Sequence, residues 1–370
     1  MTIIAGKFST AASRWVGVGP YYAMFPSRFA DHVIATHSKI GDTIIDPFAG
    51  RGTSIFSAAT SGRHALGVEI NPVGWVFAVT KLKPAFHKKA LVRAEEINEL
   101  SGRFRRAAQR MPEFYLRCFS PKVLAYLLAA RQHLEWRTSS IDRTLMAILL
   151  IDLHGKRENA LSNQLRQTKC MAPEYAVRWW NKRKMKPPNL DPVEYLTKKL
   201  KWRYAHGLPE ISESRVFLGD STKRIRGLSI ATARLAPRGA KLLFTSPPYL
   251  GITNYHYDQW LRLWLLGGTE LPHSSGEPHR SRFTNPTQYH DLLVSSFTKS
   301  RDLLASDATI YVRTDRRRET SSITRDVLKR IFPKHVICRR IRPLIGLTQT
   351  RLFGNGAPDY GEVDLVLTPN

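Results

Sequence analysis

A turn that contains two prolines follows an apolar run at residues 241–249 and ends it with Ser246-Pro247-Pro248-Tyr249. The prolines fix the backbone and remove two amide donors, so carbonyl oxygens remain as acceptors. An exocyclic amino group on a nucleobase is a poor nucleophile because its lone pair is delocalised into the ring. A site that alkylates it must therefore accept its hydrogens while presenting an electrophile in line. Ser246 and the Pro247 carbonyl suit that acceptance, and Tyr249 suits stacking on an extruded base, worth roughly 1–3 kcal/mol.

A glycine turn precedes this one in the chain, after a β-branched run that ends near residue 46. Gly50 and Gly52 allow the backbone to turn tightly and to approach a ligand without a side-chain clash. Taken alone, the glycine pattern occurs both in nucleotide-binding turns and in purely structural turns. The Ser-Pro-Pro-Tyr pattern likewise has the alternative interpretation of an ordinary end of a strand. The segment reads Asp46-Pro47-Phe48-Ala49-Gly50-Arg51-Gly52-Thr53.

Acidic residues end two further β-branched runs. Glu69, followed by Asn71, stands about one strand after the glycine turn, where a carboxylate can accept both hydrogen bonds of a ribose diol. Asp220 ends a third run, where it can accept a hydrogen bond from an adenine amino group. The alternatives are a surface or helix-capping carboxylate for Glu69 and a turn or helix-cap aspartate for Asp220.

Short β-branched runs that end in Gly, Asp, Asn or Pro, mostly followed by helix-compatible stretches, predict a parallel α/β sheet. The last two runs have no convincing helix between them, so they are expected to pair antiparallel. The predicted fold is a Rossmann-like α/β domain with a seven-stranded, mostly parallel sheet and a helical insertion. The seven runs cover residues 43–47, 65–71, 215–220, 241–247, 308–314, 335–341 and 363–368.

The predicted insertion covers residues 84–212 and divides the remaining sheet domain into a first part at 1–83, with the glycine turn, and a second part at 213–370, with the Ser-Pro-Pro-Tyr turn. It shows helical patterning at 88–110, 121–137 and 141–154. It holds 25 Lys and Arg against 12 Asp and Glu, about half of the whole chain's excess positive charge. This makes the insertion the leading candidate for nucleic-acid contact.

Two other segments carry weaker signals. The densest basic stretch, Trp179-Trp180-Asn181-Lys182-Arg183-Lys184-Met185-Lys186-Pro187-Pro188, suits phosphate contact and base stacking, with a solvated linker as the alternative. The aromatic stretch at 255–263 is interpreted either as a wall of the base pocket or as core packing. Residues 267–286, rich in Gly, Ser, His and Pro, are predicted to form loops.

The charge of the whole chain favours a polyanionic partner. In 370 residues, 57 Lys and Arg against 30 Asp and Glu give a formal net charge of +27 and a pI near 10.3. Ribosomal and membrane-surface proteins share this bias, so charge alone does not decide the partner. No apolar run reaches the roughly 18 residues of a membrane span, and the first ten residues lack a signal pattern, so a cytoplasmic location is expected.

The three cysteines argue against two kinds of chemistry. Cys118, Cys170 and Cys338 lie far apart without metal-ligand spacing, so we expect reduced thiols and no metal site. Methylation of cytosine at carbon 5 needs a thiolate nucleophile, and none of the three follows a proline in a comparable turn.

The segment 46–53 resembles motif I of the amino-methylating DNA methyltransferases, which bind S-adenosylmethionine. Ser246-Pro247-Pro248-Tyr249 resembles motif IV of the same family, where a serine at the first position is associated with cytosine N4 and an aspartate or asparagine with adenine N6. Upstream, Ala23-Met24-Phe25-Pro26-Ser27-Arg28-Phe29 resembles the Phe-Pro element that flanks the cofactor. The resemblance covers residues 21–83 and 213–370, and no motif of the family matches the insertion at 84–212. The order of cofactor turn, insertion and catalytic turn resembles the family arrangement that places target recognition between the two motif blocks, which implies that role for the insertion.

The resemblance implies transfer of a methyl group from S-adenosylmethionine to cytosine N4 of a base flipped out of duplex DNA, by direct displacement. A cognate restriction enzyme is a further implied partner. The alternatives are an adenine-N6 DNA methyltransferase, an RNA amino-methyltransferase and a non-catalytic nucleic-acid-binding protein. The implied catalytic residues are Ser246, Pro247, Pro248 and Tyr249. The implied cofactor-binding residues are Phe25, Pro26, Asp46, Pro47, Phe48, Gly50, Gly52, Thr53, Glu69, Asn71 and Asp220.

Overall fold

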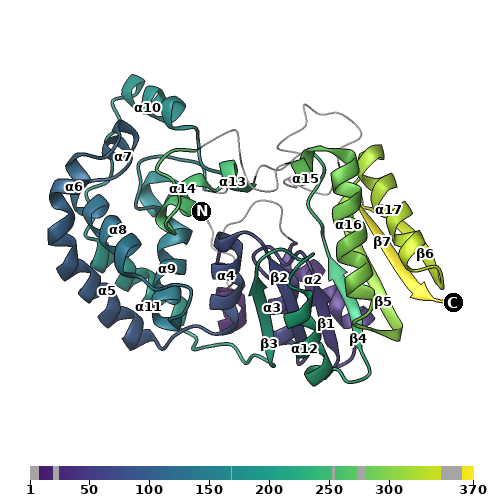
Figure 1. Ribbon diagram of the computed structural model, residues 1–370. Helices are drawn as coiled ribbons and strands as arrows, with labels where there is room; N and C mark the ends of the chain where they lie inside the picture. Colours follow the sequence, from purple (N-terminus) through teal and green to yellow (C-terminus); the bar gives the residue numbers. More distant parts are fainter. Residues whose placement is uncertain (1–7, 20–24, 168, 252–254, 273–280, 343–360) are drawn as a thin grey trace. The chain divides into compact units, whose positions relative to one another are not determined.

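The computed structural model describes the chain except for residues 1–7, 20–24, 168, 252–254, 273–280 and 343–360 (Figure 1). The chain divides into two compact units. The helical unit comprises Met1–Tyr21, Val79–Pro209 and Tyr255–Ser275, and the sheet unit comprises Tyr22–Ala78, Glu210–Asn254 and Gly276–Asn370. The sequence-based division places residues 1–21 and 255–275 with the methyltransferase parts, whereas by contacts they group with the insertion.

The sheet unit is built on seven strands, and each of the seven β-branched runs forms one of them. Neighbouring strands follow the order β3-β2-β1-β4-β5-β7-β6. The first five run parallel, and β7 pairs antiparallel with both β5 and β6. This confirms the predicted Rossmann-like, mostly parallel sheet and its antiparallel final pair. The strands are β1 (Thr43–Asp46), β2 (His64–Glu69), β3 (Ser214–Leu218), β4 (Ala240–Thr245), β5 (Leu304–Asp315), β6 (His335–Arg342) and β7 (Glu362–Pro369).

Helices cover both faces of this sheet, because its central strands are apolar on both sides. Ile45 and Leu243 are register partners, so their side chains lie on the same face of the sheet. On that face they belong to two hydrophobic clusters that include residues of α12, α16 and α17. Phe244 points to the other face and packs there against Phe29 of α2, which in turn contacts α3. The helices of the unit are α2 (Ser27–His37), α3 (Thr53–Thr60), α4 (Pro72–Leu82, which extends into the helical unit), α12 (Ile225–Leu235), α15 (Ser281–Thr284), α16 (Pro286–Arg301) and α17 (Arg318–Ile331).

The helical unit contains most of residues 84–212, and three of its longer helices begin after a capping residue. Ser120, Ser139 and Asp191 each accept a hydrogen bond from a backbone N–H of the first turn of the following helix. All three predicted helical patterns form helices. The helices are α1 (Ala11–Trp15), α5 (His87–Ser101), η1 (Gly102–Phe104), α6 (Arg105–Gln109), α7 (Glu113–Cys118), α8 (Pro121–His133), α9 (Ser140–Asp152), η2 (Arg157–Asn159), α10 (Pro173–Lys182), α11 (Pro192–Tyr204), α13 (Tyr255–Asp258) and α14 (Trp260–Leu265).

The aromatic stretch at 255–263 contributes to the core of this helical unit. Trp260 is 4% exposed and meets the Phe114 ring edge-on at 4.9 Å between centroids. Trp180 is fully buried and donates its indole N–H to the Gln164 carbonyl at 2.8 Å, so it is a core residue rather than a stacking surface. Arg183 instead lies over the ring of Trp179 at 4.5 Å.

All three cysteines are free thiols, with Cys118 and Cys170 buried and Cys338 exposed. Among the helices of the described residues, none combines the length and the apolar character needed to cross a membrane.

Candidate active site

The glycine turn connects the end of β1 to the start of α3 in the sheet unit. Gly50 and Gly52 have φ angles of 55° and 72°, in the left-handed region that side chains disfavour. A Cβ on Gly52 would lie 2.7 Å from the Cβ of Ala78 on α4, so the close approach of that helix also requires glycine. A Cβ on Gly50 would meet nothing within 4 Å. Gly50 therefore leaves open space beside the turn, as a ligand-binding backbone needs.

Asp46, the last residue of β1, holds this turn together from inside. Its carboxylate accepts from the Phe48 amide at 3.0 Å and from the Ser54 hydroxyl of α3. It also accepts from Thr245 Oγ1, the last residue of β4, at 2.6 Å. Burial raises the pKa of Asp46 to about 6, although the three hydrogen bonds oppose the rise. Asp46 thus links the glycine turn to the strand that leads into Ser246-Pro247-Pro248-Tyr249, the predicted catalytic turn.

Glu69 ends β2 and braces the same turn from the other side. Its Oε2 accepts from the Gly50 amide at 2.6 Å, and its Oε1 accepts from the Asn71 amide at 2.7 Å. Burial raises the pKa of Glu69 to about 7, opposed by these two hydrogen bonds and assisted by the charge of Asp46. Gly74 of α4 was not among the predicted site residues. A Cβ on Gly74 would lie 2.9 Å from the Gly50 carbonyl oxygen, so the close approach of α4 to the glycine turn requires glycine there as well.

The donors and acceptors around this turn fit S-adenosylmethionine. A carboxylate offers about four lone-pair sites, and Glu69 uses one on each oxygen, so both oxygens can still accept from a ribose diol. Two buried polar atoms, Thr53 Oγ1 and Asn71 Nδ2, find no hydrogen-bond partner within the part of the chain that the structure describes. Both belong to the predicted cofactor-binding residues. Unsatisfied buried groups beside an open glycine backbone are what a polar ligand would satisfy.

Asp220 lies beyond β3 at the same sheet edge, because the amide of the preceding Gly219 donates to the Glu69 carbonyl at 2.8 Å. Its carboxylate accepts from Arg282 Nη1 at 2.6 Å and from the Thr222 amide at 2.8 Å. Burial raises the pKa of Asp220, but these hydrogen bonds outweigh it and lower the pKa to about 2. The carboxylate is therefore ionised and forms an ion pair with Arg282. Its role toward an adenine amino group stays a prediction.

Phe25 and Pro26 approach the site from the face of the sheet that α2 covers. The Phe25 ring stacks on Phe244 of β4 with centroids 4.7 Å apart, and Pro26 precedes the first residue of α2. The other described residues of the Phe-Pro element continue into α2, while Ala23 and Met24 lie outside the described residues.

The catalytic turn leaves β4 directly after Thr245. Ser246 is half-buried, and Tyr249 is only 7% exposed. Ser246 Oγ donates to the Tyr249 hydroxyl at 3.4 Å, and that hydroxyl donates to Glu362 Oε1 at 3.3 Å. Since a hydroxyl has one hydrogen, this arrangement leaves the lone pairs of Ser246 available to accept from another donor. Burial, assisted by the charge of Glu362, raises the pKa of Tyr249 well above its ordinary value, so the phenol is neutral.

A buried ion-pair network behind the catalytic turn was missed by sequence reasoning. Arg313 of β5 donates to Asp364 of β7 through Nε at 2.7 Å and Nη2 at 3.0 Å, and its Nη1 lies 3.1 Å from Glu362 Oε2. The Tyr311 hydroxyl also donates to Asp364, at 2.7 Å. The sequence does indicate that such a network exists, because a charged residue within an apolar strand is rarely buried unless it is paired. Identifying the pair requires the register, which places Arg313 directly opposite Asp364.

The two turns lie at neighbouring strand ends. β1 and β4 pair in parallel, with Ile44 opposite Leu242 and Ile45 opposite Leu243, so their carboxyl ends meet at one edge. In the order β3-β2-β1-β4-β5, this is the position where the chain reverses its direction of winding, the usual ligand site of an open α/β sheet. The arrangement brings ribose acceptors, open glycine backbone and a serine with free lone pairs to one sheet edge.

Comparisons with known proteins match part of the chain. Residues 6–73 match a family model for N6/N4-type enzymes described as DNA methylase. A type II methyltransferase of Methanocaldococcus jannaschii is 33% identical over 67 residues, which is 18% of this chain and 13% of that protein. A type II methyltransferase of Methanothermobacter thermautotrophicus is 39% identical over 49 residues, 13% of this chain and 14% of that protein. These matches confirm the predicted resemblance to amino-methylating DNA methyltransferases, and the chain spans less than a sixth of either relative.

Among solved structures, an rRNA methyltransferase of Streptomyces viridochromogenes is 14% identical and aligns over 98% of this chain and 96% of its own, with a TM-score of 0.34. A putative rRNA-methylase of Clostridium thermocellum is 10% identical over 94% of this chain and 100% of its own, with a TM-score of 0.35. Likenesses at these TM-scores carry no argument about this chain.

Proposed function

We propose that this protein is an S-adenosylmethionine-dependent methyltransferase that acts on the exocyclic amino group of a base in duplex DNA, with cytosine N4 as its target. The observation that carries the proposal is the hydrogen bond between Thr245 and Asp46, at 2.6 Å. It ties the strand end before Ser246 to the glycine turn. Cytosine is preferred over adenine because Ser246 occupies the first position of the catalytic turn; an adenine-N6 enzyme is the alternative product specificity.

Ser246 and the Pro247 carbonyl accept the hydrogens of the target amino group in this proposal. That acceptance turns the nitrogen lone pair out of conjugation and toward the electrophile. S-adenosylmethionine supplies an electrophilic methyl group when bound, and transfer is a direct displacement without a covalent enzyme intermediate. Ser246 can accept because its own hydrogen is engaged by Tyr249.

Glu362, Arg313 and Asp364 position the catalytic turn in this proposal rather than touching the base. Glu362 accepts from Tyr249, and Arg313 holds Glu362 and Asp364 in place. The guanidinium of Arg313 also lies 3.4 Å over the Phe29 ring of α2. Such a fully paired network restricts the turn to one arrangement.

We propose that the helical unit supplies much of the DNA-binding surface. Exposed basic side chains occur from η1 to the residue after α6, and from the end of α10 to residue 186, where Arg183 covers Trp179. Their contribution is expected mainly through phosphate contacts, which position a duplex without reading its sequence. The exposed basic residues of these segments are Arg103, Arg105, Arg106, Arg110, Lys182, Arg183, Lys184 and Lys186.

The deciding experiment is methyl transfer from isotopically labelled S-adenosylmethionine to duplex DNA and, side by side, to tRNA. The products are digested to nucleosides and identified by mass spectrometry. Labelled N4-methylcytosine from duplex DNA is the expected result. N6-methyladenine would correct the target base, and label in tRNA alone would refute the DNA assignment. Cofactor binding without transfer to either substrate would leave a non-catalytic nucleic-acid-binding protein as the better interpretation.

A second experiment addresses the recognition sequence and the proposed cognate restriction enzyme. DNA from a host that expresses the protein is sequenced by a method that detects modified bases. One short recurring methylated sequence is expected. An extract of the source organism that cleaves this sequence only when it is unmethylated would support the cognate restriction enzyme.

A further inference from the structure

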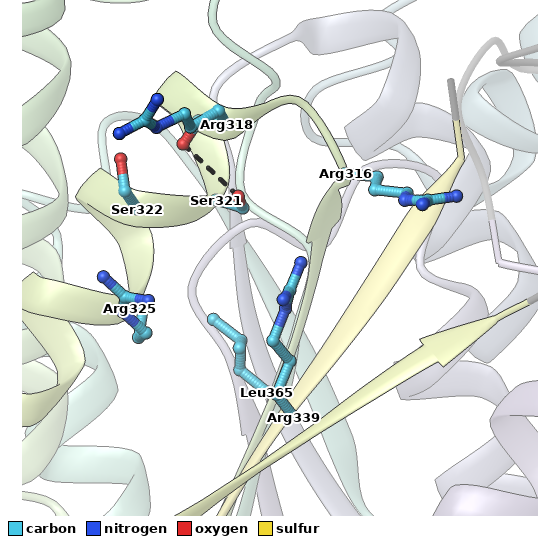
Figure 2. Close-up of a pocket in the computed structure, with 7 residues that line it drawn as sticks. All are labelled: Arg316, Arg318, Ser321, Ser322, Arg325, Arg339 and Leu365. Atoms are coloured by element: carbon cyan, nitrogen blue, oxygen red, sulfur yellow. Dashed lines mark hydrogen bonds between the residues drawn. The ribbon is translucent and has the colours of Figure 1, made fainter. Parts of the chain in front are cut away.

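A cavity lined by arginines lies in the sheet unit beside α17 and is not part of the site described above. Its volume is about 520 Å³, and seven described residues line it. Four of these are arginines, two are serines, and none carries a carboxylate (Figure 2). The lining residues are Arg316, Arg318, Ser321, Ser322, Arg325, Arg339 and Leu365.

The helix and the sheet each supply one wall. Arg318, Ser321, Ser322 and Arg325 follow the spacing i, i+3, i+4 and i+7, so they share one face of α17. The opposite wall comes from the sheet, with Arg316 directly after β5 and Arg339 on β6, opposite Leu365 of β7 (Figure 2). The helix and the sheet thus both contribute exposed guanidinium groups to the lining of one cavity.

The charges of this cavity are largely uncompensated. Arg325 pairs with Asp326 at 3.0 Å, outside the lining set. Among the described residues, no carboxylate lies within ion-pair distance of the other three arginines. The guanidinium group is a fork of N–H donors that matches a phosphate, and serine hydroxyls add further donors. The lining therefore fits an oxyanion, and the oxyanions that the proposed DNA substrate carries are its backbone phosphates.

The cavity begins next to the catalytic turn. Arg317, which stands between Arg316 and Arg318, donates to Asp315 at 2.7 Å and also to the carbonyl of Leu250, the residue after Tyr249. Consecutive Cα atoms are about 3.8 Å apart, so the Cα atoms of Arg316 and Arg318 lie about that far from the Cα of Arg317, which contacts the turn directly. A nucleotide strand that presents one base to Ser246 carries further phosphates on each side of that base.

We propose that this arginine cavity binds a backbone phosphate of the DNA strand that carries the target base. The proposal rests on the proposed methylation of duplex DNA and places a phosphate anchor in the sheet unit, in addition to the basic surface of the helical unit. Its role is to hold the register of the strand while one base is out of the stack.

The test compares two pairs of charge-removing substitutions in the full chain. The cavity variant is Arg318→Gln with Arg339→Gln, one residue from each wall. The control is Arg330→Gln with Lys334→Gln, two exposed residues outside the cavity that remove the same charge. Affinity for a DNA duplex is measured by fluorescence anisotropy over a series of salt concentrations, and unfolding curves verify that both variants are folded.

The expected result is a salt dependence of log K that is shallower by about one in the cavity variant, for the one phosphate contact that is lost, and unchanged in the control. Affinity should fall equally for different duplex sequences, because phosphate contacts carry no base information. Equal slopes in both variants, whether reduced or unchanged, would overturn the phosphate site.

The same experiment separates this inference from the proposed function. If wild-type protein methylates duplex DNA and the cavity variant keeps its full salt dependence, the phosphate site is wrong and the methyltransferase proposal stands. If wild-type protein methylates tRNA alone and the cavity variant loses affinity for tRNA, the proposed function is wrong, and the cavity binds RNA rather than DNA. If wild-type protein methylates duplex DNA and only the cavity variant, not the control, loses affinity for the duplex, both proposals are supported.

Discussion

Replacing Thr245 by valine tests the link between the two turns. The substitution removes the hydroxyl that donates to Asp46 at 2.6 Å, at a position that is 0% exposed. A buried hydrogen bond to a charged group contributes about 1.5–3 kcal/mol. We expect the free energy of unfolding to fall by an amount in this range near neutral pH, since Asp46 would retain only two of its three donors.

The loss should depend on pH, because Asp46 has a pKa of about 6 in the folded protein against an ordinary value of 3.8. A raised carboxyl pKa means that folding disfavours ionisation, so the folded state loses stability as pH rises through this window. Without Thr245 the pKa of Asp46 rises further, and this loss continues to higher pH. The variant should therefore be closer to wild type at about pH 5 than at about pH 8.

The assay is urea unfolding at these two pH values, together with kcat for methyl transfer. Thr43→Val is the matched control, because Thr43 is 1% exposed on β1 and donates only to the neutral Leu235 carbonyl, at 3.3 Å. A neutral hydrogen bond contributes about 0.5–1.5 kcal/mol and brings no pH dependence. Thr245→Val should also lower kcat, whereas Thr43→Val should not. Equal losses of stability in both variants, with no pH difference and no effect on kcat, would refute the proposed link.

Three further predictions concern the turns themselves. Gly52→Ala should lose more stability than Gly41→Ala in thermal unfolding, and should also lose cofactor affinity in calorimetry. Both glycines have positive φ, 72° and 87°, but only at Gly52 would the new Cβ meet a neighbour, 2.7 Å away; equal losses would contradict the close approach. Ser246→Ala should lower kcat by about 10²- to 10⁴-fold while cofactor affinity is retained, and undiminished transfer would remove Ser246 from the mechanism. Affinity for S-adenosylmethionine should rise with pH as Glu69, with a pKa of about 7, ionises and becomes a better acceptor for the ribose diol. The affinity of the Glu69→Gln variant for S-adenosylmethionine should not change with pH in this range. A wild-type affinity that is also independent of pH would exclude the role of Glu69 toward the ribose diol.

Local sequence determined the strands, the turns and much of the helical insertion. β-branched runs and glycine or proline punctuation are local signals, and all seven runs form strands in the structure. The glycine turn was recognisable because it depends on φ angles and close approach that only glycine permits, which is a property of the residue type itself. Glu69 and Ser246 could be predicted from the chemistry of their side chains and their positions after strands, whereas Phe25 and Asp46 were predicted through the resemblance to the motifs of a known family.

Tertiary structure alone decided which of these residues meet. The contact of Thr245 with Asp46 joins residues 199 positions apart and exists because β1 and β4 are neighbours. The pairing of Arg313 with Asp364 depends on the register of an antiparallel pair, where a shift of one residue would point the two side chains to opposite faces. The arginine cavity likewise needs β6 to lie beside α17. The sequence gives the type of each side chain. A strand can pair with any other strand of suitable pattern, so the contacts between residues of different strands follow only from the packed sheet.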